Sequence, residues 1–166
     1  MAMFKGNLGQ IGLDVSDGSL EAVQLRSSRK STSFQMVGWS RIVLPPGAVT
    51  AGIVMKEPDV VESLRQLFSK PTFGSLDGRQ VVLSIPEHQA YHYVASISSW
   101  ESNGGLFSQV QSYLAAKLPL PIDSVHWDWR IVGEQTSRVF VYICAIPREV
   151  VEGYRKPLKS LGMVVS

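Results

Sequence analysis

Side chains that could take part in chemistry are concentrated in one short segment near the N-terminus. The segment from Asp14 to Ser19 begins with a carboxylate at the end of an apolar run and continues with hydroxyl residues, a second carboxylate and a glycine. Backbone N–H groups in such a turn can form a nest that binds an anion, so the segment could hold a phosphate. The alternative is an ordinary polar β-turn, because Asp, Gly and Ser tolerate turn geometry. The residues of this candidate phosphate loop are Asp14, Ser16, Asp17, Gly18 and Ser19.

Other reactive side chains are scattered along the chain. The three histidines, His88, His92 and His126, do not have the spacing of metal ligands on one helix, which favours structural or surface histidines. Glu87 follows a strand end without a second carboxylate or a nucleophile at useful spacing, so we interpret it as part of a surface turn. Cys144 lies in an apolar run, which predicts a buried and inert thiol. We therefore expect no catalytic residues and no metal site.

Composition excludes several classes of protein. Charged residues make up 18% and hydrophobic residues 45% of the 166 residues, which is typical of a folded core and not of disorder. The net charge of +2 and the scattered basic residues do not form a nucleic-acid footprint. The single cysteine excludes an internal disulfide and fits a reducing compartment. No apolar run approaches the roughly 18–20 residues of a membrane span, so we expect a cytoplasmic chain without direct membrane insertion.

Elements of the first half must position the candidate loop. Apolar runs separated by turn residues predict a hairpin, and a third run completes a three-stranded meander. Apolar residues at helical spacing follow, between prolines that suit a helix start and a helix end. A further apolar run predicts a strand that is covered on both faces and could pair in parallel with the first. In chain order, the strands are 11–15, 20–25 and 34–44, the helix is 59–69, and the last strand is 80–85.

The second half predicts another α/β unit. We expect strands at 91–97, 125–132 and 138–146, helices at 106–118 and from Pro147 to Gly162, and the start of a strand at 163–165. Trp127 and Trp129 alternate on one strand, so both indoles share a face. That face is either part of the core or an exposed platform for a peptide. Trp100 lies in a polar loop and is the better candidate for a contact with a partner.

Several short sequence segments, taken in their order along the chain, are similar to the N-terminal part of PilM proteins, the actin-like, FtsA-related proteins of type IV pilus assembly. No single segment is diagnostic, but the order and spacing of the segments are more specific than any one of them. The residues that carry the resemblance are Ile11 to Leu25, Leu44 to Val49 with Gly52 and Ile53, Val81 to Pro86, Lys117 to Pro121, Asp128 with Trp129, and Pro147 to Val151.

The resemblance implies an α/β fold: a partial actin-like (ribonuclease H-like) subdomain at 1–86, an inserted strand-helix-strand-strand module at 87–162, and a return strand from 163 to 166. In the family, a second actin-like half completes the ATP site, so we expect no cofactor here, with ATP and Mg²⁺ confined to a full-length form. The loop also departs from the family pattern, because Ser16 replaces a glycine, Glu21 replaces a lysine and Asp17 adds a negative charge. An added carboxylate near a phosphate costs Coulomb energy.

The resemblance also implies a partner. PilM binds the N-terminal cytoplasmic tail of the inner-membrane protein PilN, in a groove between the actin-like subdomain and the inserted module. We therefore expect a non-catalytic scaffold, peripheral to the inner membrane through this partner and able to self-associate. The alternatives are an ATPase in the full-length form and a GspL-like component of type II secretion. The candidate partner-binding residues are Ile85, Pro86, Tyr91, Trp100, Leu118 and Leu120.

Overall fold

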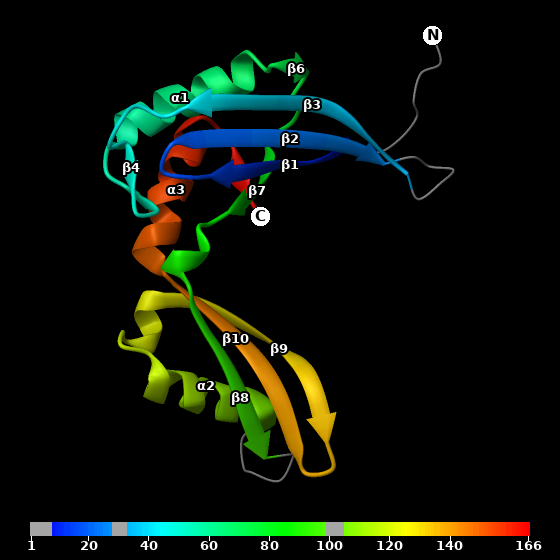
Figure 1. Cartoon of the computed structure of the whole chain (residues 1–166), viewed down its shortest axis with the longest axis vertical. Helices are drawn as coiled ribbons and strands as arrows, with labels where there is room; N and C mark the ends of the chain where they lie inside the picture. Colours follow the sequence, from blue (N-terminus) through cyan, green and yellow to red (C-terminus); the bar gives the residue numbers. More distant parts are fainter. Residues whose placement is uncertain (1–7, 28–32, 99–104) are drawn as a thin grey trace. The chain divides into compact units, whose positions relative to one another are not determined.

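The computed structural model describes residues 8–27, 33–98 and 105–166, and the chain forms two compact units. Unit 1 consists of Met1–Pro86 together with Glu152–Ser166, and unit 2 consists of Glu87–Val151. The described part of each unit contains a β-sheet with α-helix packed on one face (Figure 1). The division falls inside the last helix, so most of that helix belongs to the same unit as the N-terminal strands.

Unit 1 is built on a six-stranded sheet in the order β11-β7-β1-β2-β3-β6. The meander predicted from the sequence is confirmed, because β1 pairs antiparallel with β2, and β2 with β3. The predicted parallel pairing of β7 with β1 is also confirmed, and β11 adds a further parallel strand. The elements are β1 (Leu8–Val15), β2 (Ser19–Ser27), β3 (Phe34–Val43), β4 (Val49–Thr50), β5 (Ile53–Val54), α1 (Glu57–Ser69), β6 (Phe73–Gly74), β7 (Gln80–Ser84), α3 (Arg148–Ser160) and β11 (Val164–Val165).

Helix α1 begins and packs as its sequence predicts. A proline occupies its first turn, where a missing N–H has no cost, and Glu57 and Asp59 complement the positive end of the helix dipole. Its apolar stripe, which includes Val60, Leu64 and Leu67, is buried against the sheet. Figure 1 shows α1 lying along β3. The stripe therefore covers one face of the sheet.

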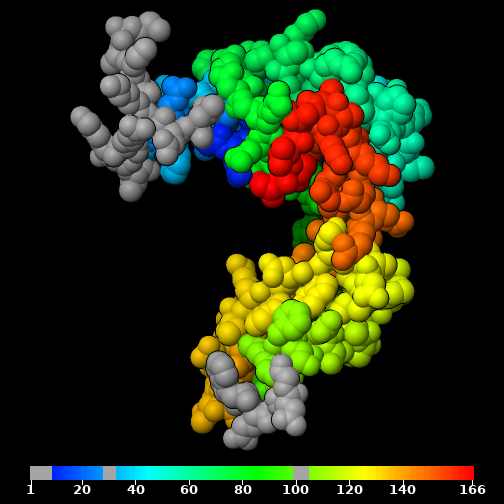
Figure 2. All heavy atoms as spheres, turned by 180° about the vertical axis from the view of Figure 1, so that it is seen from behind, coloured from blue at the N-terminus to red at the C-terminus, as the bar shows by residue number. Residues whose placement is uncertain are grey.

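Helix α3 packs on the same face of this sheet. Its buried Tyr154 and Leu158 line a small internal void together with Leu13 of β1 and residues of α1. The helix contains Pro157 and ends before Gly162, whose φ of +73° is the left-handed conformation expected after a helix. Figure 2 shows its C-terminal part and β11, coloured red, at the surface of unit 1. Both helices of unit 1 therefore lie on the side of the sheet to which Leu13 points.

The prediction that β7 is covered on both faces is wrong. Val81 is fully buried, but Val82 is 46% exposed, so the strand alternates between a covered and an uncovered face. An apolar run alone cannot distinguish a strand buried on both sides from one whose second face is open. The structure resolves the ambiguity because α1 and α3 occupy only one side.

Unit 2 is a three-stranded antiparallel sheet in the order β8-β10-β9 with a helix on one face. The predicted hairpin is confirmed, but its turn is shorter than expected, because β9 continues to Gln135. A register shift between Phe140 and Val141 marks a β-bulge in this pair. The elements are β8 (Tyr91–Ser98), α2 (Gly105–Lys117), β9 (Val125–Gln135) and β10 (Arg138–Pro147), with 3-10 turns at Glu87–Gln89 and Ile122–Ser124.

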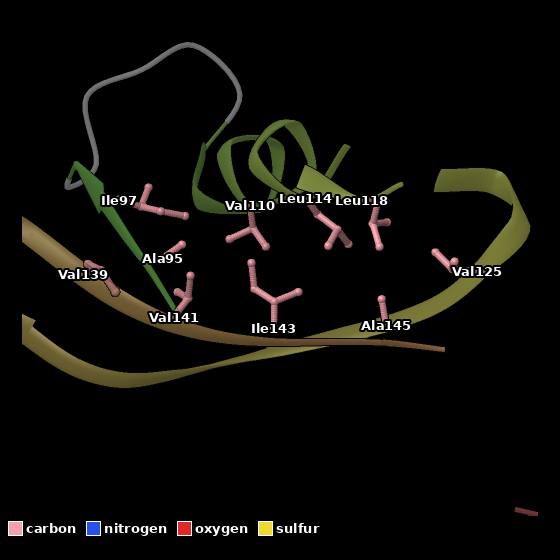
Figure 3. Close-up of a cluster of buried hydrophobic side chains, with 10 residues drawn as sticks. All are labelled: Ala95, Ile97, Val110, Leu114, Leu118, Val125, Val139, Val141, Ile143 and Ala145. Atoms are coloured by element: carbon pink, nitrogen blue, oxygen red, sulfur yellow. The ribbon is translucent and has the colours of Figure 1, made fainter. Parts of the chain in front are cut away.

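The core of unit 2 lies between α2 and the sheet (Figure 3). Val110 and Leu114 of α2 point toward Val141 and Ile143 of β10, and all four side chains are fully buried. Both indoles of the alternating pair, Trp127 and Trp129, pack against this cluster from β9. Trp127 also stacks on Phe107, with ring centroids 5.5 Å apart. Of the two interpretations of this pair, the structure therefore supports the core face.

Candidate functional site

The candidate phosphate loop is the turn between β1 and β2. The backbone N–H of Ser19 donates to Ser16 Oγ at 3.0 Å, and the backbone N–H of Ser16 donates to the carbonyl of Ser19 at 3.0 Å. The two hydroxyl oxygens lie 3.2 Å apart, within hydrogen-bonding distance of each other. The carbonyl of Gly18 accepts a bond from the N–H of Leu44 at 2.9 Å. The polar groups of the turn therefore bond mainly to one another and to the backbone of Leu44, the residue after β3.

Asp17 is bound to a second turn. Its carboxylate accepts hydrogen bonds from the N–H groups of Ala51 at 2.7 Å and Gly52 at 2.8 Å. Both donors lie in the turn between β4 and β5, where φ is +49° at Ala51 and +72° at Gly52. Successive N–H groups in such a turn form an anion-binding nest. The nest is therefore occupied by a carboxylate of the protein itself.

Tyr154 of α3 holds the same turn from the core side. Its hydroxyl donates to the carbonyl of Gly52 at 2.5 Å, and its side chain is buried. Burial, together with the smaller effect of the nearby Asp17 carboxylate, raises the pKa of Tyr154 to about 12. Gly52 is thus held through its N–H by Asp17 and through its C=O by Tyr154. This hydrogen-bonded chain links β1–β2, β4–β5 and α3 within unit 1.

Asp14 does not face the nest. It is exposed, and the β-sheet register places it beside Ser84 of β7 and Glu21 of β2. Within the described residues its carboxylate makes no hydrogen bond and no ion pair. The structure therefore separates the two carboxylates of the candidate loop, and a phosphate at the nest would have to displace Asp17.

The face of the sheet opposite α1 and α3, which we call the open face of unit 1, carries a second candidate site. Cross-strand pairing lines up an apolar row across five strands, and a neighbouring polar row lies beside it. A hollow of about 410 Å³ lies over these rows, and Gly12, between Val82 and Val23, adds no side chain to fill it. The apolar row is Val82, Gly12, Val23, Trp39 and Phe73, and the polar row is Ser84, Asp14, Glu21 and Arg41.

Sequence reasoning missed the hollow on the open face. The signal was present as alternation, since Val23 and Val82 stand on strands whose neighbouring residues are buried. We interpreted the run containing Val82 as buried on both faces, and Gly12 as part of an apolar strand. The gap became visible only when strand pairing placed Gly12 between Val23 and Val82.

The predicted partner-binding residues are divided between the two units. Ile85 and Pro86 follow β7 in unit 1 and are half-buried. In unit 2, Tyr91 and Leu120 are partly buried and pack against the core, whereas Leu118 is itself a core residue with 9% exposure. Trp100 lies outside the described residues.

The open face of unit 2 carries polar side chains that contact one another. Tyr142 Oη and His92 Nδ1 lie 2.6 Å apart, and their rings stack. The guanidinium of Arg130 lies over the Tyr142 ring, 5.8 Å from its centroid. Cys144 of the same face is half-buried rather than fully buried, and desolvation, followed by the Asp128 carboxylate, raises the pKa of its thiol. A raised pKa disfavours the reactive thiolate.

Two classes of site are absent from the part of the chain that the structure describes. Across residues 8–27, 33–98 and 105–166, no three His, Cys, Asp or Glu side chains gather closely enough to hold a metal ion. None of the helices in these ranges is long and apolar enough to cross a membrane.

Comparison with known proteins gave a match to one family model and to solved structures. Residues 12–165 match the model of the type IV pilus assembly protein PilM. A solved structure described as a PilM–PilN type IV pilus biogenesis complex is similar with a TM-score of 0.77 and 19% identity, over 94% of this chain and 45% of that one. The chain therefore spans less than half the length of that relative.

A weaker likeness concerns the cytoplasmic domain of EpsL, an inner-membrane component of the type II secretion system of Vibrio cholerae. Its TM-score is 0.49 with 13% identity, over 96% of this chain and 56% of that one, which is too low to support a conclusion. No curated protein matches the chain. The first likeness confirms the predicted α/β, actin-like fold, and the family model covers nearly the whole sequence. The chain belongs to the family of the type IV pilus assembly protein PilM.

Proposed function

We propose that this chain is a non-catalytic scaffold of type IV pilus assembly that binds the N-terminal cytoplasmic tail of a PilN-type inner-membrane protein. Membership of the PilM family supports the pilus context, and a similar solved structure is described as a complex of PilM with PilN. The non-catalytic part of the proposal rests on the chain's own geometry.

The observation that carries the proposal is the carboxylate of Asp17 in the nest of Ala51 and Gly52. In a nucleotide-binding protein, N–H groups of this kind are free to receive a phosphate. Here an aspartate already satisfies both, and its negative charge opposes a phosphate at the same place. The Ser16 and Ser19 groups are bonded to each other, so they are not directed at a ligand. These contacts favour binding of a protein partner over nucleotide chemistry.

For the tail itself, we propose contacts with Ile85, Pro86 and Tyr91. These residues follow or begin strands, and their apolar side chains are only half-buried. Peptide recognition commonly combines an apolar surface with backbone hydrogen bonds from a strand end. Within unit 2, Leu120 is similarly half-buried, and Leu118 belongs to the core against which Tyr91 and Leu120 pack.

Calorimetric titration with a synthetic PilN-type N-terminal tail peptide tests the proposal. We expect binding to the 166-residue chain, and weaker binding by the Ile85→Ser variant. Val43→Ser is the matched control, because Val43 is 74% exposed on β3 and is not assigned to the contact. Binding that is equally strong in both variants would remove Ile85 from the site. An absence of binding in the unmodified chain would refute the tail-binding proposal.

A parallel thermal-shift experiment with ATP and Mg²⁺ tests the non-catalytic part. A ligand at a hundred times its dissociation constant adds about 2.7 kcal/mol to stability, which is easily detected. We expect no shift for the unmodified chain. The Asp17→Gly variant serves as a comparison, since it removes the carboxylate that accepts from the N–H groups of Ala51 and Gly52. A clear shift in the unmodified chain would favour the ATPase alternative.

A further inference from the structure

The open face of unit 1 is an apolar surface that no described element of its own unit covers. Val82, Val23 and Phe73 of the apolar row are 46%, 37% and 53% exposed. Helices α1 and α3 pack on the opposite face, where their side chains meet Leu13. A contiguous apolar surface of this kind on a folded domain marks an interaction site.

In each of the two rows on this face, the residue on β1 and the residue on β3 are complementary and lie on either side of β2. In the apolar row, Gly12 of β1 leaves a gap and Trp39 of β3 supplies bulk, with Val23 of β2 between them. In the polar row, β1 carries the acidic Asp14 and β3 carries the basic Arg41, again on either side of β2. The gap at Gly12 and the bulky Trp39 therefore lie on opposite sides of β2, one strand away from it. The acidic Asp14 and the basic Arg41 are placed in the same way.

We propose that a second copy of this chain covers the open face of unit 1. The two copies are related by a two-fold axis that lies between their sheets and is parallel to β2. Such an axis places β1 of one copy opposite β3 of the other, so Trp39 of each copy enters the gap over Gly12 of the other. The same operation places Arg41 of each copy opposite Asp14 of the other. Each contact occurs twice, because the interface is isologous. Two sheets that pack face to face lie about 10 Å apart, which allows their side chains to interdigitate.

Charge explains why the occupant is a second copy and not an uncharged apolar segment. The Asp14 carboxylate has no ion-pair partner in the described part of the chain, and an apolar cover would bury it uncompensated. Arg41 uses its Nε toward Glu21, at 3.2 Å, and its other guanidinium N–H groups can reach a second carboxylate. In the proposed pair, Arg41 contacts Glu21 of its own chain and Asp14 of the other copy. Each Asp14 then gains a basic partner, although the row keeps more carboxylates than guanidinium groups because Glu21 of each copy also lies on it.

Sedimentation equilibrium of the 166-residue chain over a series of concentrations tests the proposal, and we expect a monomer–dimer equilibrium. The Gly12→Val variant fills the gap in both copies. A Cβ at Gly12 would meet only Val23, at 3.5 Å for the nearest side-chain atom, so the variant should fold normally, which circular dichroism can verify. We expect its dimer dissociation constant to rise at least about tenfold, because Trp39 can no longer enter. Val94→Ser in unit 2, at a residue 64% exposed, should leave the constant unchanged.

A charge exchange distinguishes this interface from non-specific adhesion. Asp14→Arg alone and Arg41→Asp alone should each weaken the dimer about tenfold or more, since each places like charges opposite each other. The two substitutions together should restore it, because acid and base have only exchanged strands and Glu21 keeps a basic neighbour. A chain that stays monomeric at all concentrations would overturn the proposal. A dimer that ignores Gly12→Val, or that the charge exchange fails to restore, would also overturn it.

Discussion

The two sheets of this protein are alike on their helix-covered faces and differ on their open faces. In unit 2, the open face carries polar groups that contact each other, as His92, Tyr142 and Arg130 do. In unit 1, the open face carries the apolar row and the carboxylate of Asp14, which pairs with none of the described residues. Arg138 of unit 2 likewise has a partner, since its guanidinium donates to Ser96 Oγ at 3.3 Å.

This difference separates a face that suits water from a face that suits a partner. Antiparallel sheets commonly leave one face in water, and polar residues on that face then need no cover. The valine and phenylalanine side chains of the apolar row cannot form hydrogen bonds with water. A complementary surface that covered the row would remove this apolar area from water, which is favourable. Catalytic residue types were therefore a poor guide here, because Ser16, Asp17 and Ser19 bond within the protein and Asp14 lies on a different face. The open face of unit 1 combines exposed apolar side chains with a carboxylate that has no partner in the described part of the chain.

The largest expected effect tests the similarity of the covered faces. Ile143→Ala removes a fully buried side chain from the core between α2 and the sheet of unit 2. We expect a loss of about 2–5 kcal/mol in the free energy of unfolding, from lost burial and the cavity left behind. Urea denaturation followed by tryptophan fluorescence measures it. Val94→Ala on the open face is the control, with an expected change within about 0.5 kcal/mol. Similar losses in both variants would mean that the open face of unit 2 is also a core.

The second effect tests whether the polar turn of unit 1 is structural. Asp17→Ala removes the acceptor for the N–H groups of Ala51 and Gly52. Charge-assisted hydrogen bonds contribute more than neutral ones, but this carboxylate is exposed, so we expect a loss of about 1–2 kcal/mol. The change in the urea midpoint, at concentrations where the chain is monomeric, measures it. Asp14→Ala, whose carboxylate has no partner among the described residues, is the matched control. Equal effects of the two substitutions would contradict a structural role for Asp17.

Much of the fold could be predicted from local patterns. The helix predicted at 59–69, and observed at 57–69, was recognisable because apolar spacing and the prolines at both ends indicate the same element. The hairpins of both units followed from apolar runs interrupted by turn residues. Of the two-residue strands in the described part of the chain, β4, β5 and β6 were not predicted, because two residues carry no detectable periodicity, whereas β11 was predicted from its apolar onset.

The site was harder to predict, because it depends on contacts between distant segments. Asp17 bonds to Ala51 and Gly52, more than thirty positions later in the sequence, and no local pattern indicates that pairing. The hollow depends on β1 lying between β2 and β7, which places Gly12 beside Val82. A glycine in an apolar run looks like a weak strand residue until its neighbours across the sheet are known.

A third, smaller effect tests the contact that Tyr154 makes with the same turn. Tyr154→Phe removes the hydroxyl that donates to Gly52, and we expect a loss of about 1 kcal/mol at neutral pH. The pKa of this phenol is about 12 in the folded chain, above its ordinary value of 10.0, so folding favours the protonated form. Its contribution is therefore fully present below pH 10 and is lost as the pH rises toward 12. Stability measured from pH 9 to 12 should fall less steeply in Tyr154→Phe than in the unmodified chain, and parallel curves would contradict this assignment.

A fourth effect measures how far polar pairing stabilises the open face of unit 2. Tyr142→Phe keeps the ring that stacks on His92 and lies under Arg130 but removes the hydrogen bond to His92 Nδ1. The pair is exposed, so water can replace the lost partner, and we expect a loss of about 0.5–1 kcal/mol. Thermal unfolding of the two chains compares them. A loss as large as that of Ile143→Ala would show that this hydrogen bond is buried in solution.

The smallest effect is expected at the centre of the apolar row. Val23→Thr on β2 keeps a β-branched shape with similar strand propensity and exchanges one methyl for a hydroxyl. Because Val23 is 37% exposed and faces away from α1 and α3, the hydroxyl can reach water in a single chain. At concentrations where the chain is monomeric, the free energy of unfolding should therefore change by no more than about 0.5 kcal/mol. In the proposed dimer, the same hydroxyl would be buried at the two-fold axis. Val23→Thr should therefore lower the free energy of unfolding only at concentrations where the chain is dimeric. A loss above about 1 kcal/mol in the monomer would show that the chain already covers this face itself, and the contrast between the two sheets would disappear.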